Sequence, residues 1–386
     1  MKGSDLPEQG IVFWPVGEGD STTLLVDAET IVQIDINHLE VAESDDDPRY
    51  PMVDELVELL PLKNGKPYLA AFVATHADED HCKGFEELLA DHDVVIGELW
   101  FTPRLVADID ADDPEELSAD ATALRVEALR RIEINLPEGA TPESGDRIRI
   151  VGYHESLEGD FDELDEDLVA VPGHAVDVVD GVDVSSNLRL FVHSPFKDDM
   201  ESTDRNKTSI GLHITLSTGV RELRALLLGD LPYEPVKQLL EYTEDEENKT
   251  WDVLLAPHHC SKYVMYERVD GDDVLRDDVL DLLEASKADK AWIVSSSSPI
   301  PVSNKAGDNP PHAKAKNRYL ERCDTFVCTG EHPDEENPIP LIFEVTDSGV
   351  AFLGSDPDGS SEAAWQIEEA RGGTAPAAAA VGFGTC

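Results

Sequence analysis

Four side chains of types that bind metal ions lie within six residues of one another. They are His76, Asp78, Asp80 and His81, in the stretch ATHADEDHCKG. Imidazole nitrogens and carboxylate oxygens are the donors that hold paired metal ions in hydrolytic enzymes. This spacing therefore predicts a site for two metal ions, although Asp-rich turns also arise by chance in an acidic chain.

The residues around this stretch predict how it is held. An apolar run at residues 69–74 predicts a buried strand, and the apolar period that resumes at Phe85 predicts a helix. The metal-binding types therefore occupy a turn from strand to helix. A strand expected at residues 30–36 contains Asp35, which either orients this turn from behind or simply ends the strand.

Two later strands also end in residues that bind metals. The strand expected at residues 223–228 leads into Asp230, and the strand expected at residues 251–256 leads into His258 and His259. Strands of one sheet deliver such residues to the same edge, where α/β folds place their ligands. We therefore expect these side chains to converge with the first stretch.

Strands and helices alternate along the first hundred residues. Strands expected at 30–36, 69–74 and 94–101 are separated by helices expected at 52–60 and from Phe85 onward. This alternation is typical of an α/β fold.

The composition is strongly acidic. The 386 residues include 30 basic and 82 acidic side chains, a formal net charge of −52, yet the hydrophobic content is an ordinary 41%, which excludes a disordered chain. Salt relieves such self-repulsion, so we interpret the charge as adaptation to a high-salt cytoplasm; an acidic protein from an ordinary cytoplasm is the alternative. No basic surface is expected, so a polyanionic substrate would depend on metal ions and a few local cations.

The cysteines and the lengths of the apolar runs indicate where in the cell the protein is expected. Five cysteines form no CxxC pair, which favours a reducing cytoplasm. No apolar run approaches the length of about 18 residues that spans a membrane, so a cytoplasmic protein without a membrane partner is expected. Cys82 and Cys260 adjoin the candidate ligands and are either metal or redox groups or small buried fillers.

The motifs THADEDH, GD and HHCS, in this order, resemble the metallo-β-lactamase fold, and within it the hydrolase domain of ComEC-type competence proteins. The likeness extends to VGEGDST near the N-terminus, to residues 206–210 and to His312 after Pro311. It spans residues 12–352, with 107–188 matching loosely. It implies an α/β fold, an αββα sandwich of two mixed sheets packed face to face with helices outside. We expect one hydrolase domain at residues 1–366, with an acidic insert at 107–188 and a disordered Ala/Gly-rich tail at 367–386.

The resemblance also implies a ligand set. His76 and Asp78 would hold a first ion, Asp80, His81 and His259 a second, and Asp230 would bridge them. His258 would face the substrate, and which of His258 and His259 is the ligand stays open. Asn206 lies where a third histidine is usual, with His193 and His213 as other candidates. Asp78 replaces a usual histidine, so the divalent ions expected are Zn²⁺ or Mn²⁺.

The implied activity is hydrolysis. Two ions about 3.5–4 Å apart would activate a bridging hydroxide that Asp80 orients, for attack on a phosphodiester, and nucleic acid is a possible substrate held through the metals. His258 or Lys262 would assist the leaving group, and His312 would reach the phosphate or cap a helix. The alternatives are hydrolysis of small esters, thioesters or lactones, or a low-turnover metal-binding component of a DNA repair or defence assembly.

Overall fold

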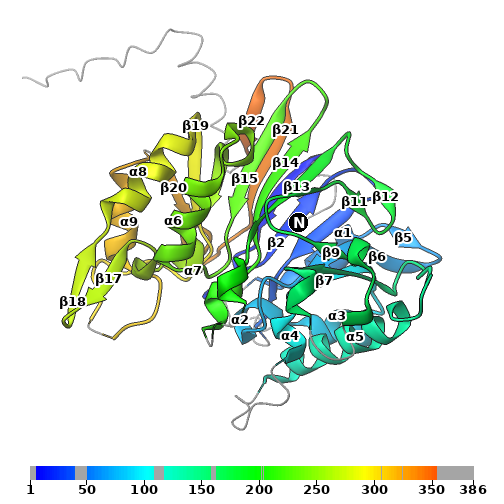
Figure 1. The fold of residues 1–386 in the computed structure, drawn as a ribbon. Helices are drawn as coiled ribbons and strands as arrows, with labels where there is room; N and C mark the ends of the chain where they lie inside the picture. Colours follow the sequence, from blue (N-terminus) through cyan, green and yellow to red (C-terminus); the bar gives the residue numbers. More distant parts are fainter. Residues whose placement is uncertain are drawn as a thin grey trace, which may run out of the picture. The chain divides into compact units, whose positions relative to one another are not determined.

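The structure is a computed structural model, and it describes residues 6–39, 50–107, 117–157, 162–200, 202, 204–305, 307–323 and 325–353. These residues form two mixed sheets with helices on the outer faces (Figure 1). This is the αββα sandwich that the resemblance implies.

The first sheet has the strand order β22-β21-β1-β2-β3-β6-β7-β8-β9, with β5 paired to β6. Neighbours from β3 to β9 are parallel, and the strands on the other side of β3 are antiparallel. The strands are β1 (Gly10–Phe13), β2 (Thr22–Leu25), β3 (Ile31–Ile34), β5 (Leu62–Lys63), β6 (Lys66–Val73), β7 (Val95–Phe101), β8 (Arg147–Val151), β9 (Val169–Ala170), β21 (Leu341–Thr346) and β22 (Gly349–Phe352).

The second sheet has the order β10-β13-β14-β15-β16-β19-β20. Its first strands are antiparallel, and β15, β16, β19 and β20 run parallel. The strands are β10 (Ala175–Val176), β13 (Leu188–Ser194), β14 (Gly211–Ser217), β15 (Glu222–Leu227), β16 (Trp251–Leu255), β19 (Lys287–Ser295) and β20 (Phe326–Cys328).

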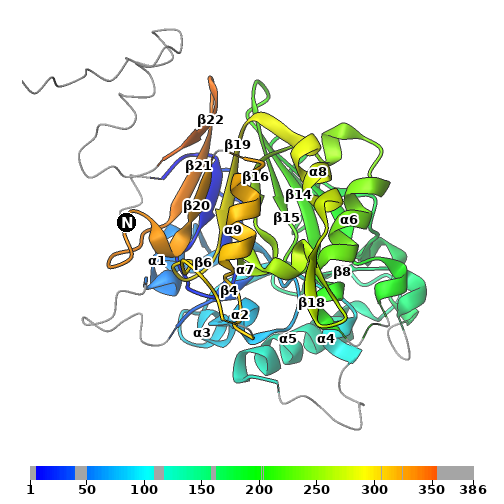
Figure 2. The same ribbon diagram turned by 90° about the vertical axis from the view of Figure 1, so that its left-hand side faces the viewer.

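The helices lie on the outer faces of the two sheets. Figures 1 and 2 show α6, α8 and α9 together on one side and α3 and α5 together on the other. The helices are α1 (Met52–Leu59), α2 (Glu79–Cys82), α3 (Phe85–Ala90), α4 (Arg104–Ala107), α5 (Ala119–Asn135), α6 (Tyr233–Tyr242), α7 (Pro257–Cys260), α8 (Asp277–Ser286) and α9 (Ala313–Leu320). The remaining short strands are β4 (Ile36–Asn37), β11 (Val178–Val179), β12 (Val182–Asp183), β17 (Tyr266–Val269) and β18 (Asp272–Leu275).

Three apolar clusters mark the layers. The inner cluster joins Val73 of the first sheet to Ile214 and Leu255 of the second. The other two clusters pack each sheet's outer face on its own helices. Strand alternation produces this division, because Phe72 points away from Val73 and meets Phe85 of α3 with ring centroids 5.0 Å apart.

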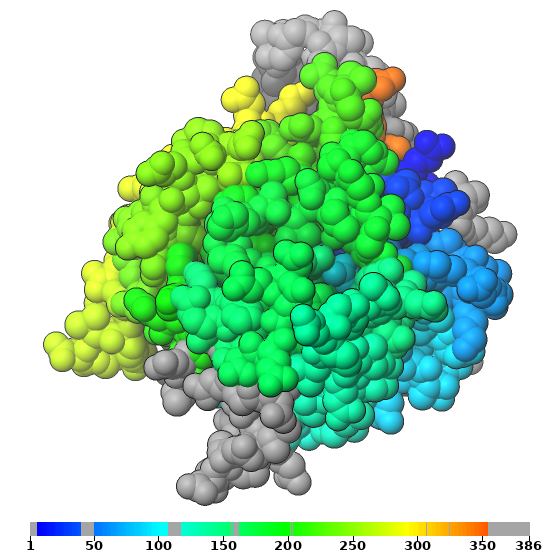
Figure 3. Space-filling view, turned by 45° about the vertical axis from the view of Figure 1, so that its right-hand side comes forward, coloured from blue at the N-terminus to red at the C-terminus, as the bar shows by residue number. Residues whose placement is uncertain are grey.

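The loosely matching segment, residues 107–188, takes part in the first sheet. Its strand β8 pairs with β7, and α5 packs on the outer cluster. Figure 3 shows the middle of the chain, in green, over the centre of one face, next to the blue and cyan segments. The expected tail at 367–386 lies outside the described residues, and no helix in the described ranges is long and apolar enough to cross a membrane.

The strands that precede the candidate ligands are parallel neighbours. β3 and β6 adjoin in the first sheet, and β15 and β16 adjoin in the second. Their carboxyl ends therefore open on the same edge of each sheet, which brings the residues that follow them together.

Candidate metal centre

Asp230 lies at the centre of the candidate site, just beyond β15. Its Oδ1 lies 3.2 Å from Nε2 of His81 and 3.5 Å from Nε2 of His259. Its Oδ2 faces other residues, 3.8 Å from Nε2 of His76 and 3.5 Å from Nε2 of His258. The two oxygens of one buried carboxylate thus face two separate sets of side chains. We name His76, Asp78 and His258 the first group, and Asp80, His81 and His259 the second group.

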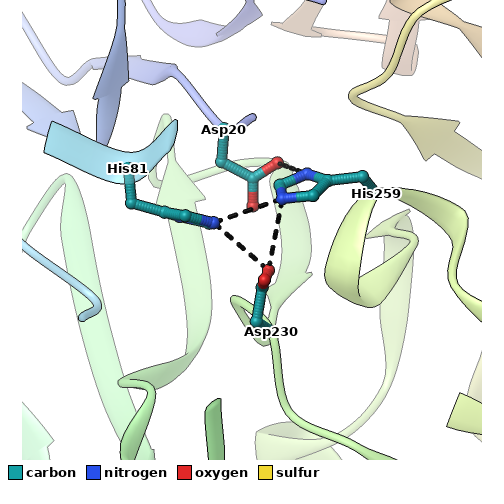
Figure 4. Close-up of side chains that lie close together, drawn as sticks. All are labelled: Asp20, His81, Asp230 and His259. Atoms are coloured by element: carbon teal, nitrogen blue, oxygen red, sulfur yellow. Dashed lines mark hydrogen bonds and ion pairs between the residues drawn. The ribbon is translucent and has the colours of Figure 1, made fainter. Parts of the chain in front are cut away.

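The second group is compact, and Figure 4 shows its two histidines together with Asp20 and Asp230. The Nε2 atoms of His81 and His259 are 3.3 Å apart, and Asp80 Oδ2 lies 3.2 Å from the latter. Ligand atoms of Asp20, His81, Asp230 and His259 all lie within 4.8 Å of one another, and all four residues are buried. This is a buried cluster of His and Asp that could bind a metal ion.

A buried carboxylate lies behind each histidine of the second group. Asp35 Oδ2 lies 2.8 Å from Nδ1 of His81, and it also accepts the Thr75 hydroxyl at 2.6 Å. Asp20 Oδ1 lies 3.3 Å from Nδ1 of His259. The hydrogen bond to Asp35 fixes the ring of His81, and the ion pair with Asp20 places a carboxylate behind the ring of His259.

The charges of the cluster favour a bound cation. Burial alone would raise the pKa of Asp230, but His259 and His81 hold it well below its usual range. Burial would lower the pKa of His81, but Asp230 and Asp35 raise it well above its usual value. Two protonated rings 3.3 Å apart would repel each other, whereas one metal ion can replace both protons.

The first group has hydroxyls and a guanidinium as its neighbours. Nε2 of His76 lies 3.7 Å from Asp78 Oδ2, and its Nδ1 lies 3.0 Å from the Thr75 hydroxyl. Asp78 Oδ1 also contacts the Arg205 guanidinium at 3.1 Å. A cation from the protein therefore competes for the one carboxylate that belongs to this group alone.

The turn after β16 separates the two adjacent histidines. His258, His259 and Cys260 are consecutive residues with positive φ, at 51°, 51° and 63°. Their two rings are perpendicular, so the rings point to different groups. The N–H of His312 donates to Cys260 O at 3.1 Å, and Nδ1 of His312 accepts the N–H of Lys262 at 3.2 Å. His312 thus holds the turn in place through two hydrogen bonds, one from its backbone N–H and one to its ring.

Several predicted residues lie in other surroundings. His312 is buried, with Nε2 against Asp308 O at 3.2 Å, and its side chain does not cap α9. The Lys262 ammonium pairs with Asp273 at 2.9 Å. Among the described residues, no hydrogen bond joins the Asn206 side chain to the cluster. The roles of His312 and Lys262 at the substrate and of Asn206 as a metal ligand stay predictions.

The other candidates named from the sequence have partners elsewhere. His193 and His213 lie inside the second sheet, with Nε2 against the carbonyl oxygens of Asn248 and Thr250. The thiols of Cys82 and Cys260 are buried, and burial raises the pKa of both. Buried, protonated thiols agree with the small-filler interpretation.

Asp20 is the member of the cluster that sequence reasoning missed. It ends the Gly-rich segment VGEGD, whose motif was noted but whose carboxylate was not. Its N–H donates to Asp80 O at 3.2 Å, which ties the segment to the metal-binding turn. A single acidic residue directly after a glycine turn, beside a strand, was the available signal.

The donor set fits a divalent cation. Nε2 of His76 and Oδ1 of Asp230 are buried without a hydrogen-bond partner from the protein. Buried polar atoms are almost always paired, so these two orphaned atoms, one in the first group and one facing the second group, indicate bound ligands. Imidazole with carboxylate suits Zn²⁺ or Mn²⁺.

Comparison with known proteins adds little. The sequence matches no protein-family model and no curated protein. A solved structure, Igni18, a novel metallo hydrolase from the hyperthermophilic archaeon Ignicoccus hospitalis, matches 74% of this chain and 94% of its own at 14% identity and a TM-score of 0.30. At this level of similarity, conclusions about the chain depend on its own strands and side chains.

Proposed function

We propose that the chain is a hydrolase with two divalent metal ions that cleaves phosphodiesters. The observation that carries the proposal is the position of Asp230, whose Oδ1 faces the second group and whose Oδ2 faces the first. A carboxylate placed in this way can bridge two ions. His258 completes the first group in this assignment, in place of the expected third histidine.

The ions would supply Lewis-acid activation of water and neutralise charge on the leaving oxygen. The residues of the chain hold the ligand side chains in position. Asp35 and Asp20 hold the rings of His81 and His259, and the turn braced by His312 directs His258 to the other side of Asp230. Asp78 and Asp80 are the more exposed carboxylates, so we expect the substrate to approach on their side.

Two features favour a phosphodiester as the substrate. The motifs resemble the hydrolase domain of ComEC-type proteins, and Arg205 lies at the open side of the centre although the chain carries a net charge of −52. A guanidinium beside the ions suits a phosphate oxygen. Cleavage of esters, thioesters or lactones uses the same centre and is the competing activity.

Product analysis distinguishes these activities. The protein, loaded with Zn²⁺ or Mn²⁺ in molar KCl, is assayed with bis-p-nitrophenyl phosphate, a short DNA strand and p-nitrophenyl acetate. We expect phosphodiester cleavage that falls about 100-fold or more in Asp230→Asn, because changes to residues behind metal ligands alone cost 10–100-fold. Asp252→Asn is the matched control, since Asp252 is also largely buried but pairs with Arg224 near the start of β16. Cleavage of p-nitrophenyl acetate alone would favour the ester activity. If the metal-loaded protein cleaves neither the phosphodiesters nor the acetate, the proposal is contradicted.

A further inference from the structure

We infer that the two groups hold their ions with unequal strength, the second group tightly and the first group weakly enough for its ion to exchange. This inference rests on the proposed two-ion centre. It concerns which ion stays with the protein and which one depends on the surrounding metal concentration.

The first observation is the chemistry behind each histidine. His81 and His259 each have a carboxylate at Nδ1, from Asp35 at 2.8 Å and Asp20 at 3.3 Å. A carboxylate behind the ring makes Nε2 a stronger donor and adds negative charge near the ion. His76 has only hydroxyls there, from Thr75 at 3.0 Å and Ser209 at 3.4 Å.

The second observation is the cation beside the first group. Arg205 Nε lies 3.1 Å from Asp78 Oδ1. An ion bound by Asp78 must share this carboxylate with the guanidinium and remain close to its charge. The described residues place no lysine or arginine in an ion pair with Asp80, its counterpart in the second group.

The third observation is exposure. The side chains of His81 and His259 in the second group are 0% and 4% exposed, and that of His76 in the first group is 2% exposed. The histidine that differs is His258 of the first group, whose side chain is 21% exposed, so water can compete for the ion there. The carboxylates do not add to this difference, because Asp78 is 28% exposed and Asp80 is 40% exposed.

Unequal affinity would make hydrolysis depend on the free metal concentration. The ion of the second group would remain bound and hold together the turns at the edge of the sheets. Loss of the ion of the first group would stop turnover without unfolding the protein. Arg205 would set the concentration at which the first ion binds.

Equilibrium titration of the metal-free protein with Zn²⁺, against a competing chelator dye, measures both affinities directly. We expect two ions, with dissociation constants at least about 10-fold apart. Asp20→Asn should weaken the tighter site about 10–100-fold, because it removes the charge behind His259. Arg205→Gln should strengthen only the weaker site.

Lys207→Gln is the matched control for Arg205→Gln. Lys207 lies on the same short helix, Arg205–Thr208, but its ammonium pairs with Glu234 at 3.8 Å, so neither affinity should change. Two ions of equal affinity, or an Arg205→Gln variant with an unchanged weaker site, would overturn the inference and leave the two-ion centre standing. Fewer than two bound ions would contradict the two-ion centre itself. The arginine variant keeps the test decisive if Asp20→Asn does not fold.

Discussion

His312 supports the metal-binding turn through its ring atoms. Its Nδ1 accepts the N–H of Lys262 and its Nε2 faces Asp308 O, so the proton belongs on Nε2. Burial also lowers the pKa of His312, which favours this neutral form. The residue therefore acts as a fixed acceptor beneath the turn that carries His258 and His259.

Two substitutions of His312 test this role. Asn places an amide oxygen near the position of Nδ1, whereas Gln places its amide near Nε2 and leaves the N–H of Lys262 unpaired. We expect His312→Gln to lower the unfolding free energy by about 1–3 kcal/mol more than His312→Asn, the cost of a buried unpaired donor. Urea unfolding of both variants measures the difference, and equal losses would show that the acceptor does not matter.

Two buried histidines of the second sheet make stability depend on pH. Burial lowers the pKa of His193 to about 3 and that of His213 to about 4. Both are neutral in the folded protein, whereas the unfolded chain binds their protons near pH 6.5. Their contribution is therefore present above about pH 6.5 and is lost as the pH falls towards about 4.

His193→Gln isolates one of these contributions, because Gln can keep a donor near Asn248 O. With a chelator present, the slope of unfolding free energy against pH between about 6 and 4.5 should decrease by about 1.4 kcal/mol per pH unit relative to the wild type. An unchanged slope would mean that His193 is not buried as a neutral ring.

At the scale of the elements, the Gly-rich segment between β1 and β2 positions the centre. Gly19 has φ of 143°, and a Cβ there would lie 2.2 Å from Asn37 Nδ2 and 2.5 Å from Asp80 O. A side chain would therefore push the segment that carries Asp20 away from Asp80.

Gly19→Ala should reduce metal affinity as well as stability. Gly219→Ala is the control, since Gly219 also has positive φ but open space around it, so it should cost about 1–2 kcal/mol of backbone strain and leave metal binding intact. Metal titration of both variants measures the affinity, and urea unfolding measures the stability. If the two variants bind metal with equal affinity, the Gly-rich segment does not position the metal centre.

The elements also show what the sequence could predict of the site. The spacing from His76 to His81 on one strand-to-helix turn is local information, and the structure places both residues against Asp230. The different directions of His258 and His259 follow from consecutive positive φ angles, which no residue type there demands. The place of Asp20 depends on a contact between distant segments, so its local signal, an acidic residue after a glycine turn, does not reveal that it joins the centre.

At the scale of the whole molecule, the α/β class followed from the alternation of apolar runs, and the αββα layers followed from the family resemblance. The strand order was beyond prediction, because it depends on pairings such as that of β1 with β21, near opposite ends of the described chain. Local periodicity specifies that a segment is a strand but carries no information about its neighbour.

The net charge of −52 predicts a strong effect of salt. Self-repulsion falls as the screening length shrinks from about 10 Å at 0.1 M to about 3 Å at 1 M. We expect the unfolding free energy of the metal-free protein to rise from dilute buffer to molar KCl, whereas sucrose of equal osmolality should have less effect. Stability that falls or stays constant with KCl would contradict the high-salt interpretation.

The most direct test of the centre is a crystal structure with Mn²⁺, using anomalous scattering to locate the ions. We expect two peaks about 3.5–4 Å apart, one on each side of the Asp230 carboxylate. One peak should lie at Nε2 of His81 and His259, and the other at Nε2 of His76 and His258. A single peak, or none at Asp230, would contradict a two-ion centre.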